Sequence, residues 1–494
     1  MNRRRPRPGP GTAIVGRVNP VLARGRGTRL LTAGAIAMAV VLALYAAYAL
    51  IRPYLSTMDP VDLQVYVDGG LIVRHVQPLY DPHAADPLYD WGGYSSLALK
   101  FTYPPFAAVA FALLSFIPFW LAKGVMMGIS VIALVAAMWF TFGGLGYRDA
   151  RVRAGLALLA SAAVFWTEPV LRTLYLGQVN LILMAMIIWD LCQPSKGRWW
   201  KGVATGVAAG IKLTPLIFIP YLLLTRRFRE AIAACAGFLA TVAVGFIFLP
   251  GDSAKWWLHG LIIKDGARTG FAGWAGNQSL SGIITRLSGS VTAGNHAWAA
   301  AVVITLVLGL AAAMFLDRAG YRLPALLLTA LTGLLVSPIS WDHHWVWIAP
   351  GFAVAAHYAA RLWDTARARA AGCLVAAVGI LAVYWAWPAS FAEKAQNLGK
   401  DSLGLIWLPP NTSPVQYTLH GDQPWYVEYR WHGLQLLAGN AFILGGIAMF
   451  AGLVLIALLV RDQRADPASP DTEASRAPAP LDPAAAAASA PVTR

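Results

Sequence analysis

The chain has 494 residues, of which 57% are hydrophobic and only 13% are charged, and its mean hydropathy is +0.56. Soluble domains carry about 25% charged residues, so this composition excludes a soluble globular protein and indicates a polytopic membrane protein. The net charge of +15 does not indicate nucleic-acid binding, because the basic residues gather in short runs and do not form one folded surface. We therefore expect a lipid bilayer, and no nucleic acid, as a partner.

The first 29 residues form a basic tail. Arginines recur between Arg3 and Arg29 with no acidic residue among them. An apolar run from Leu30 to Ile51 follows, and its length of about 20 residues is enough to cross a hydrocarbon core. The positive-inside rule predicts a cytoplasmic tail and a retained first transmembrane helix.

The rest of the chain alternates between apolar segments and polar loops. Long polar loops cover residues 58–105, 250–296 and 389–435. The apolar segments between them predict an all-α polytopic membrane protein with about 11–12 transmembrane helices. After the first helix these segments lie at about residues 104–119, 122–143, 153–167, 177–192, 202–225, 231–249, 297–316, 323–338, 345–360, 371–388 and 436–460.

Basic clusters predict the orientation of the spans. In the second half these clusters fall at alternate ends, which places the loops at residues 250–296, 338–344 and 389–435 outside. The first half obeys the rule only if segment 104–119 or 122–143 is a short juxtamembrane helix and segment 202–225 is re-entrant. We favour this arrangement over full crossing, because it puts the polar motifs on one side. The clusters used here lie at residues 226–229, 317–318, 361–369 and 461–464.

These patterns predict three regions. Residues 1–29 form the basic cytoplasmic tail and residues 30–460 the integral-membrane domain. Residues 461–494 are rich in Ala, Pro, Ser and Asp and lack an apolar period, which predicts a disordered cytoplasmic tail.

The first outer loop concentrates acidic residues in a chain that is poor in charge. Asp62 and Tyr66 are four residues apart, so a helix would place both on one face. Aromatic rings stack on sugars and carboxylates accept hydrogen bonds from sugar hydroxyls, so this composition suits a sugar site. An interfacial aromatic belt with solvated acids explains it equally well. The acids are Asp59, Asp62, Asp68, Asp81, Asp86 and Asp90, and Tyr103 stands at the entry to the next span.

Two basic residues lie in or beside apolar segments, where a charged side chain is energetically costly. Arg172 stands at a membrane boundary, in a motif that continues to Gln178 and Asn180, and its guanidinium suits a phosphate as well as it suits snorkelling. Lys212 lies near the middle of an apolar segment, which predicts a functional role or a buried partner.

Further polar motifs lie in the later outer loops. Asn277 and Gln278 follow a tryptophan, and Trp341 precedes the adjacent pair His343 and His344. Adjacent histidines point about 100° apart on a helix, so we expect no metal site there. A hydrogen-bonding or phosphate-contacting role and a purely interfacial role both remain open for the pair.

In their order and membrane placement, these motifs resemble the C-type integral-membrane glycosyltransferases. Within them the chain is similar to glycosyltransferase family 87, the actinobacterial polyprenol-phosphate-mannose-dependent α-mannosyltransferases. The resemblance covers about residues 30–460. The motifs that carry it are Asp62–Tyr66, Leu79-Tyr80, Tyr103-Pro104-Pro105, Gly177–Asn180, Lys212 with Pro215, Asn277–Ser279, and Ser340-Trp341 with His343-His344.

The resemblance implies an inverting enzyme on the periplasmic face of the plasma membrane, with both termini cytoplasmic. It implies a polyprenyl-phosphate mannose donor and a glycolipid acceptor, namely phosphatidylinositol mannoside, lipomannan or lipoarabinomannan, joined through an α-1,2 linkage. It also implies an aspartate of the first outer loop as general base. By position this residue is Asp62, with Asp59 and Asp68 as local alternatives.

The leaving phosphate needs cationic or hydrogen-bond donor groups, and the candidates are Arg172, Lys212, Arg268, His343 and His344. We expect no cofactor and no metal. A polyprenyl-phosphate arabinofuranosyltransferase and a flippase or transporter remain alternative functions. We expect Asp62 and His344 to be catalytic and the substrate to contact Tyr66, Tyr103, Arg172, Gln178, Asn180, Lys212, Asn277, Gln278, Trp341 and His343.

Overall fold

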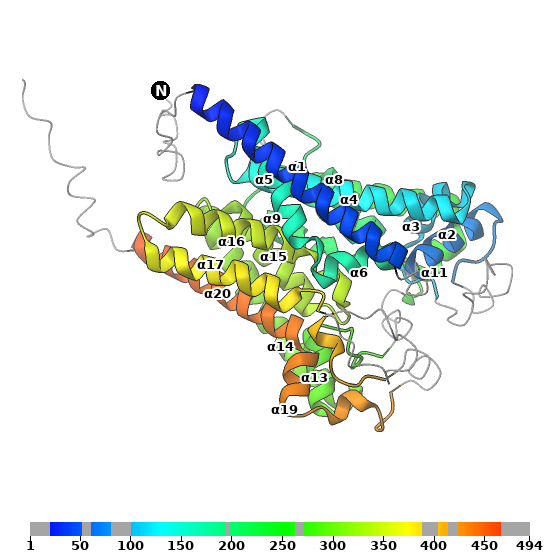
Figure 1. Ribbon diagram of the computed structural model, residues 1–494. Helices are drawn as coiled ribbons and strands as arrows, with labels where there is room; N and C mark the ends of the chain where they lie inside the picture. The colour runs from blue at the N-terminus through cyan, green and yellow to red at the C-terminus, as the bar shows by residue number, and fades with distance from the viewer. Residues whose placement is uncertain are drawn as a thin grey trace, which may run out of the picture.

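The described part of the chain is a bundle of helices (Figure 1). The computed structural model describes residues 20–51, 61–80, 100–193, 198–261, 271–387, 404–412 and 422–465. Within these ranges there are no strands, only two isolated bridges, so the predicted all-α fold is confirmed. The expectations for both tails before residue 20 and after residue 465, and for Asp59, Asp81, Asp86, Asp90 and Arg268, concern residues outside this description.

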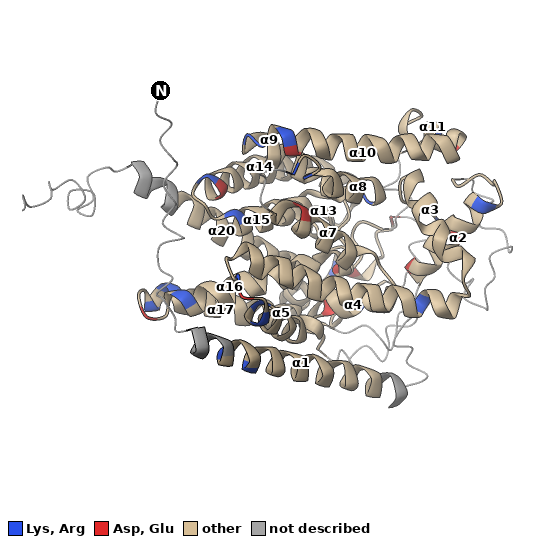
Figure 2. Ribbon diagram, turned by 90° about the horizontal axis from the view of Figure 1, so that it is seen from above, with Lys and Arg blue, Asp and Glu red and all other residues tan. Residues whose placement is uncertain are grey.

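Long apolar helices form the body of the bundle. Among the described residues six are long and apolar enough to cross a membrane, or up to seven if a bent pair counts as one span. In Figure 2 the middle parts of these helices carry no charged residues, and Lys and Arg lie mainly at the helix ends. The six are α1 (Pro20–Ile51), α4 (Phe119–Gly144), α10 (Phe228–Phe248), α14 (Val291–Arg318), α17 (Arg367–Tyr384) and α20 (Ala441–Ala465). The first and last extend past the predicted domain limits at residues 30 and 460.

The bundle has two ends: we call the end where α1 begins the near end, and the opposite end the far end. Shorter helices also run from one end to the other. At the near end, Arg151 Nη1 lies 3.5 Å from Thr28 Oγ1, close to the start of α1. At the far end, Thr167 pairs with Trp385. Helix α5 (Ala150–Phe165) runs from the first contact to the second. Other helices between the ends are α7 (Asn180–Cys192), α15 (Arg322–Val336) and α16 (Ile348–Leu362).

Segment 104–119 remains at the far end. It forms α3 (Pro105–Phe111) and η3 (Ala112–Phe116), which pack on α2 (Val61–Arg74). The guanidinium carbon of Arg74 lies 4.0 Å from the centre of the Phe116 ring. This segment is a short apolar helix, as the favoured arrangement expected. The segment is therefore not among the six candidate spans.

Segment 202–225 is a hairpin that enters and leaves at the near end. It consists of α8 (Val203–Ile211), η4 (Thr214–Ile217) and α9 (Phe218–Leu224). At its start, Gly202 N donates to Asp190 Oδ1 at 2.8 Å, and at its end Tyr221 donates to Asp317 Oδ1 at 2.9 Å. This hairpin has the shape that the favoured re-entrant arrangement expected, and none of its helices is among the six candidate spans.

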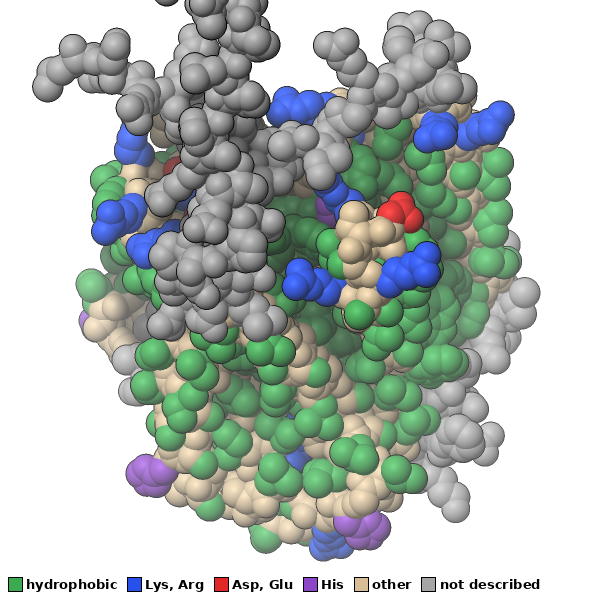
Figure 3. Space-filling model, turned by 90° about the vertical axis from the view of Figure 1, so that its left-hand side faces the viewer, with side chains coloured by type: hydrophobic (Ala, Val, Ile, Leu, Met, Phe, Trp, Pro, Cys, Tyr) green, Lys and Arg blue, Asp and Glu red, His purple; other side chains and the backbone are tan. Residues whose placement is uncertain are grey.

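Ion pairs join several charged side chains at the near end. Arg227 pairs with Asp317 at 2.6 Å, and Glu230 pairs with Lys201 at 3.1 Å and with Arg322 at 3.8 Å. Seen from the left of Figure 1, basic side chains lie around the upper part of the surface and hydrophobic ones dominate below (Figure 3). This distribution suits a protein whose sides face lipid and whose ends face water.

Short helices cover the far end and carry most of the predicted motifs. Besides α2 and α3, they are α6 (Glu168–Leu176), α11 (Pro250–Trp257), α13 (Leu280–Ser288), η6 (Asp342–Trp347), η9 (Leu405–Trp407), η10 (Val427–Arg430) and α19 (Gly433–Gly439).

Candidate active site

A sharp bend after α6 turns two predicted site residues inward. Gly177 ends α6 with a φ of 67°, a left-handed conformation that glycine adopts without strain. Gln178 N donates to Thr173 O at 2.9 Å, which closes the turn. The axes of α6 and α7 then differ by 116°. As a result, Gln178 lies in the bend and Asn180 begins α7.

Three polar side chains fasten α2 to this bend. Tyr66 donates to Gln178 Oε1 at 2.6 Å, and its hydroxyl lies 3.1 Å from that of Tyr103. Gln178 Nε2 in turn donates to the Tyr103 hydroxyl at 3.2 Å. The Tyr66 ring is fully buried and stacks on Phe111 at 4.1 Å. These residues hold in place the helix that carries Asp62, which precedes Tyr66 by four residues.

Lys212 reaches the same region from the tip of the hairpin. Helix α8 stops at Ile211, because Lys212 is extended, with φ −144° and ψ 130°. Its Nζ lies 2.9 Å from Asn180 Oδ1 and 2.9 Å from His344 Nε2. Three residues predicted separately from distant motifs therefore meet.

Hydrogen-bond directions define the protonation of the Lys212–His344 pair. The backbone N–H of Trp341 donates to His344 Nδ1 at 3.2 Å. Burial lowers the pKa of His344 well below its ordinary value, with further lowering by Lys212 and His343, so the ring is neutral and carries its proton on Nε2. This N–H can only donate to Lys212 if the lysine is an uncharged amine. An anion brought to Lys212 would favour its protonated form.

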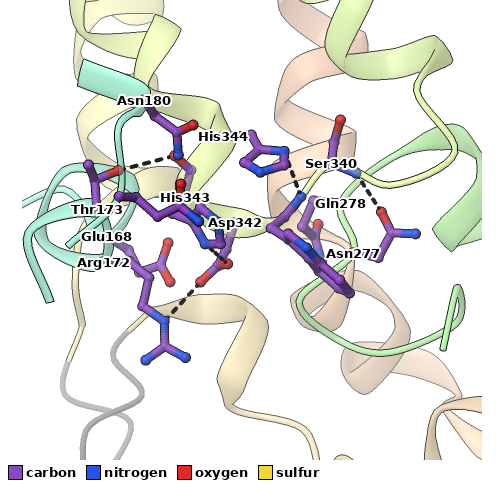
Figure 4. Close-up of polar contacts among 12 residues, drawn as sticks. Glu168, Arg172, Thr173, Asn180, Asn277, Gln278, Ser340, Asp342, His343 and His344 are labelled. Carbon is purple, nitrogen blue, oxygen red and sulfur yellow. Dashed lines mark hydrogen bonds and ion pairs between the residues drawn. The ribbon is translucent and has the colours of Figure 1, made fainter. Parts of the chain in front are cut away.

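A second polar group lies beside the first (Figure 4). Arg172 Nε lies 3.5 Å from Asp342 Oδ2, and His343 Nδ1 lies 3.0 Å from Asp342 Oδ1. The backbone carbonyl of His343 accepts from Asn180 Nδ2 at 2.9 Å and from Thr173 Oγ1 at 3.2 Å. The histidine motif is thus tied to both α6 and α7.

Asp62 links the two polar groups electrostatically. Its side chain is partly exposed in the first turn of α2. Its charge acts on Tyr66, on Arg172 and on Lys212. A carboxylate, a guanidinium and an amine from three segments therefore lie within electrostatic reach of one another, as reaction of an anionic substrate requires.

A cavity with mainly apolar walls leads to the Lys212 group. It lies among α7, the hairpin, α15 and η6, and Asn180, Lys212 and His344 supply polar lining. The apolar walls include Leu183, Met184, Ile187, Ile217, Phe218, Leu334, Val346 and Trp347.

Asn277 and Gln278 are fully buried; the Asn277 side chain bonds the backbone just before η6, and the Gln278 side chain bonds the backbone at α19 and α20. Asn277 Nδ2 donates to Ala272 O and Pro338 O, and its Oδ1 accepts from Ser340 N at 2.9 Å. Gln278 Nε2 donates to two carbonyls and its Oε1 accepts from Ile443 N at 3.1 Å. These hydrogen bonds give both amides a structural role. Contact of either amide with the substrate stays a prediction.

Comparison with known proteins identifies the family. The model of glycosyltransferase family 87 matches residues 101–338. A Mycobacterium tuberculosis (strain CDC 1551 / Oshkosh) protein is 34% identical over 392 residues, which are 78% of this chain and 81% of the relative. Its name is polyprenol-phosphate-mannose-dependent alpha-(1-2)-phosphatidylinositol pentamannoside mannosyltransferase. The chain belongs to glycosyltransferase family 87.

A second relative of this family 87 member has a related name. A polyprenol-phosphate-mannose-dependent alpha-(1-2)-phosphatidylinositol mannoside mannosyltransferase of Mycobacterium tuberculosis (strain ATCC 25618 / H37Rv) is 32% identical over 319 residues. These cover 62% of this chain and 72% of the relative. No solved structure matches the chain. The resemblance inferred from the motifs is thus confirmed, and the chain is a glycosyltransferase.

The structure adds residues to this family 87 site that the sequence prediction left out. Glu168 and Asp342 lie in motifs that were recognised, beside Arg172 and the histidine pair, and their carboxyl groups were the available signal. Trp407 donates through Nε1 to Glu168 Oε1 at 3.0 Å. Nothing in the sequence around Trp407 indicates this contact. Among the described residues, no group of three or more His, Cys, Asp or Glu is arranged to hold a metal ion.

Proposed function

We propose that this glycosyltransferase moves mannose from a polyprenyl-phosphate donor to a mannosyl hydroxyl of a phosphatidylinositol mannoside, forming an α-1,2 linkage. The names of the relatives support the donor, the sugar and the acceptor class. The observation that carries the proposal is the placement of the Asp62 carboxylate within electrostatic reach of Arg172 and Lys212. This arrangement offers a base to one substrate and cations to the other.

The donor would occupy the cavity beside Lys212. Its isoprenoid chain would lie against the apolar walls, where burial of apolar surface is favourable. Its phosphate would then reach Lys212, Asn180 and His344. The approach of this anion favours protonation of the Lys212 amine, which strengthens its hydrogen bonds to the phosphate.

Asp62 would act on the acceptor. A carboxylate that removes the proton from the attacking hydroxyl as it approaches the anomeric carbon contributes about 10²- to 10⁴-fold to the rate. A single displacement inverts a β-mannosyl phosphate to an α-mannoside. The leaving phosphate gains negative charge, which Lys212, His344 and Arg172 would stabilise. These groups make a metal or cofactor unnecessary for the proposed reaction.

The test is Asp62→Asn in purified enzyme with labelled polyprenyl-phosphate mannose. We expect less than about a hundredth of wild-type transfer, from loss of the general base, with an unchanged melting temperature. Asp68→Asn is the matched control, because Asp68 lies on the same helix and was an alternative base; it should retain activity. Asp62→Asn with more than a tenth of wild-type transfer would refute this role.

The same assay separates the alternative functions. Arabinofuranose transfer would use Asp62 equally, so labelled arabinosyl and mannosyl donors must be compared in one preparation. A flippase would move the labelled lipid across sealed vesicles without forming a glycosidic bond. The two relatives' names favour mannose as the transferred sugar.

We further propose that the far end of the bundle faces the periplasm and that both termini are cytoplasmic, in the plasma membrane. The basic residues at the start of α5 support this orientation, because Arg151 lies beside Thr28 at the end where α1 begins.

A further inference from the structure

Two buried carboxyl groups meet beside Arg172. Glu168 begins α6 and Asp342 begins η6, and each residue is 2% exposed. Their side chains are within hydrogen-bonding range of each other, and Figure 4 shows both next to the Arg172 side chain. Two carboxylates can only accept, so a hydrogen bond between them requires a proton on one of them.

The partners of the four carboxyl oxygens locate this proton between the two groups. Glu168 Oε1 accepts from Trp407 Nε1, and Asp342 Oδ1 faces His343 Nδ1. Glu168 Oε2 and Asp342 Oδ2 are buried, and no N–H or hydroxyl hydrogen bond from the described residues reaches them. One proton shared by these two oxygens would satisfy both, whereas two buried charges without it would repel each other.

The charged neighbours indicate which group holds the proton. Asp342 has the Arg172 guanidinium at 3.5 Å, and a positive neighbour stabilises its carboxylate. Glu168 has an uncharged indole as its hydrogen-bond donor. The proton therefore belongs to Glu168, and the pair carries one negative charge opposite one guanidinium.

We propose that Glu168 is a positioning residue for Arg172: as a neutral acid it donates to Asp342 and leaves a balanced Asp342–Arg172 pair. This inference rests on the proposed function, in which Arg172 contacts the donor phosphate. The terminal nitrogens of Arg172 point away from the carboxyl pair (Figure 4). Its guanidinium carbon lies 5.0 Å from the Tyr175 ring and 5.5 Å from the Trp407 ring, which limit its movement.

Loss of the Glu168 proton would change the net charge of the group formed by Glu168, Asp342 and Arg172. A second carboxylate would attract Arg172 and would repel an anionic donor. The charged groups that act on Glu168 are Asp342 on η6 and Arg172 on its own helix. Tyr175 and Asp62 act on Arg172, and His343 acts on Asp342. Because the acid must be protonated, activity is retained below its pKa and is lost as the pH rises above it.

The experiment compares the pH dependence of kcat/KM for the donor in wild-type enzyme and Glu168→Gln. Glutamine can accept from Trp407 and donate to Asp342 without a titrating proton. We expect Glu168→Gln to remain within about threefold of wild type at neutral pH. Its alkaline loss of activity should begin at least about one pH unit higher than in wild type.

Two further variants separate positioning from packing. Glu168→Ala removes both hydrogen bonds and should raise the donor KM at least about tenfold, with a smaller effect on kcat. Glu428→Gln changes another buried carboxyl group, which is bonded to Thr412, and should retain the wild-type pH profile.

An unchanged alkaline limb in Glu168→Gln would overturn the proposal, as would a loss equal to that of Glu168→Ala at neutral pH. Failure of Glu168→Gln to fold would also overturn it, because glutamine preserves both hydrogen bonds. If wild-type enzyme forms no mannoside in the same assay, the proposed function fails instead, so the two failures are distinguishable.

Discussion

Burial alone changes the pKa of Asp68, a residue of the far end. It lies on α2, and its Oδ1 is buried without a hydrogen-bond partner among the described residues. Burial raises the pKa of Asp68 to about 7. The folded protein therefore binds more protons than the unfolded chain between about pH 4 and pH 7. Stability from this site is greatest at low pH and falls as the pH rises through that window.

Replacing Asp68 should remove this dependence of stability on pH. In Asp68→Asn, we expect an apparent melting temperature a few degrees above wild type at pH 8 and close to wild type at pH 4, because asparagine is uncharged at both. Thermal unfolding of the purified protein at the two pH values measures the difference. Asp364→Asn, at an exposed position, should show no such effect, and an equal shift at both pH values would contradict the prediction.

At the residue scale, sequence patterns predicted which side chains are important better than they predicted the role of each one. The spacing of Asp62 and Tyr66 predicted one helical face, and the cost of a lysine in an apolar segment predicted partners for Lys212, which are Asn180 and His344. The bonds of Asn277 are different: its amide meets backbone groups that the chain brings together only on folding. No local pattern distinguishes such an amide from one that faces a ligand.

At the element scale, close packing of the hairpin on α10 positions Lys212. A Cβ on Gly206 would lie 2.0 Å from the carbonyl oxygen of Ala234. Backbone atoms cannot yield to this contact as a flexible side chain can, so α8 would have to move away from α10. The hairpin tip would move with it.

Gly206→Ala should therefore lower both stability and transfer. Overpacking costs about 1–3 kcal/mol, and displacement of Lys212 should reduce transfer at least about tenfold. Melting temperature and initial rate in the same preparation are the measurements. Gly128→Ala is the matched control, because a Cβ there meets nothing within 4 Å. Wild-type rate and stability in Gly206→Ala would show that the hairpin is not held in this way.

At the scale of the whole molecule, the path of the chain collects the motifs at one end. Segment 104–119 is a short apolar helix and segment 202–225 is a hairpin, and the bend between α6 and α7 lies at the far end with α2 and η6. If segments 104–119 and 122–143 had both crossed, the basic residues after α4 would have broken the positive-inside rule. The topology and the composition of the site thus depend on the same two segments.

Cysteine labelling tests the proposed orientation. In a parent chain with Cys192, Cys235 and Cys373 replaced by alanine, Lys255→Cys introduces an exposed thiol at the far end and Arg229→Cys one at the near end. In spheroplasts, a membrane-impermeant maleimide should label Lys255→Cys, and should label Arg229→Cys only after lysis, because the bilayer excludes the reagent. The reverse pattern would invert the proposed topology.

The sequence by itself determined the membrane class, the all-α fold, the order of the motifs and their family, because span length, helical period and basic clusters are local properties of the chain. Only the tertiary structure decided that the hairpin brings Lys212 to Asn180 and His344, and that Trp407 meets Glu168 across 239 residues. Such contacts depend on which segments cross and which turn back. That outcome is a balance of packing and burial over the whole bundle, which no single stretch of sequence contains.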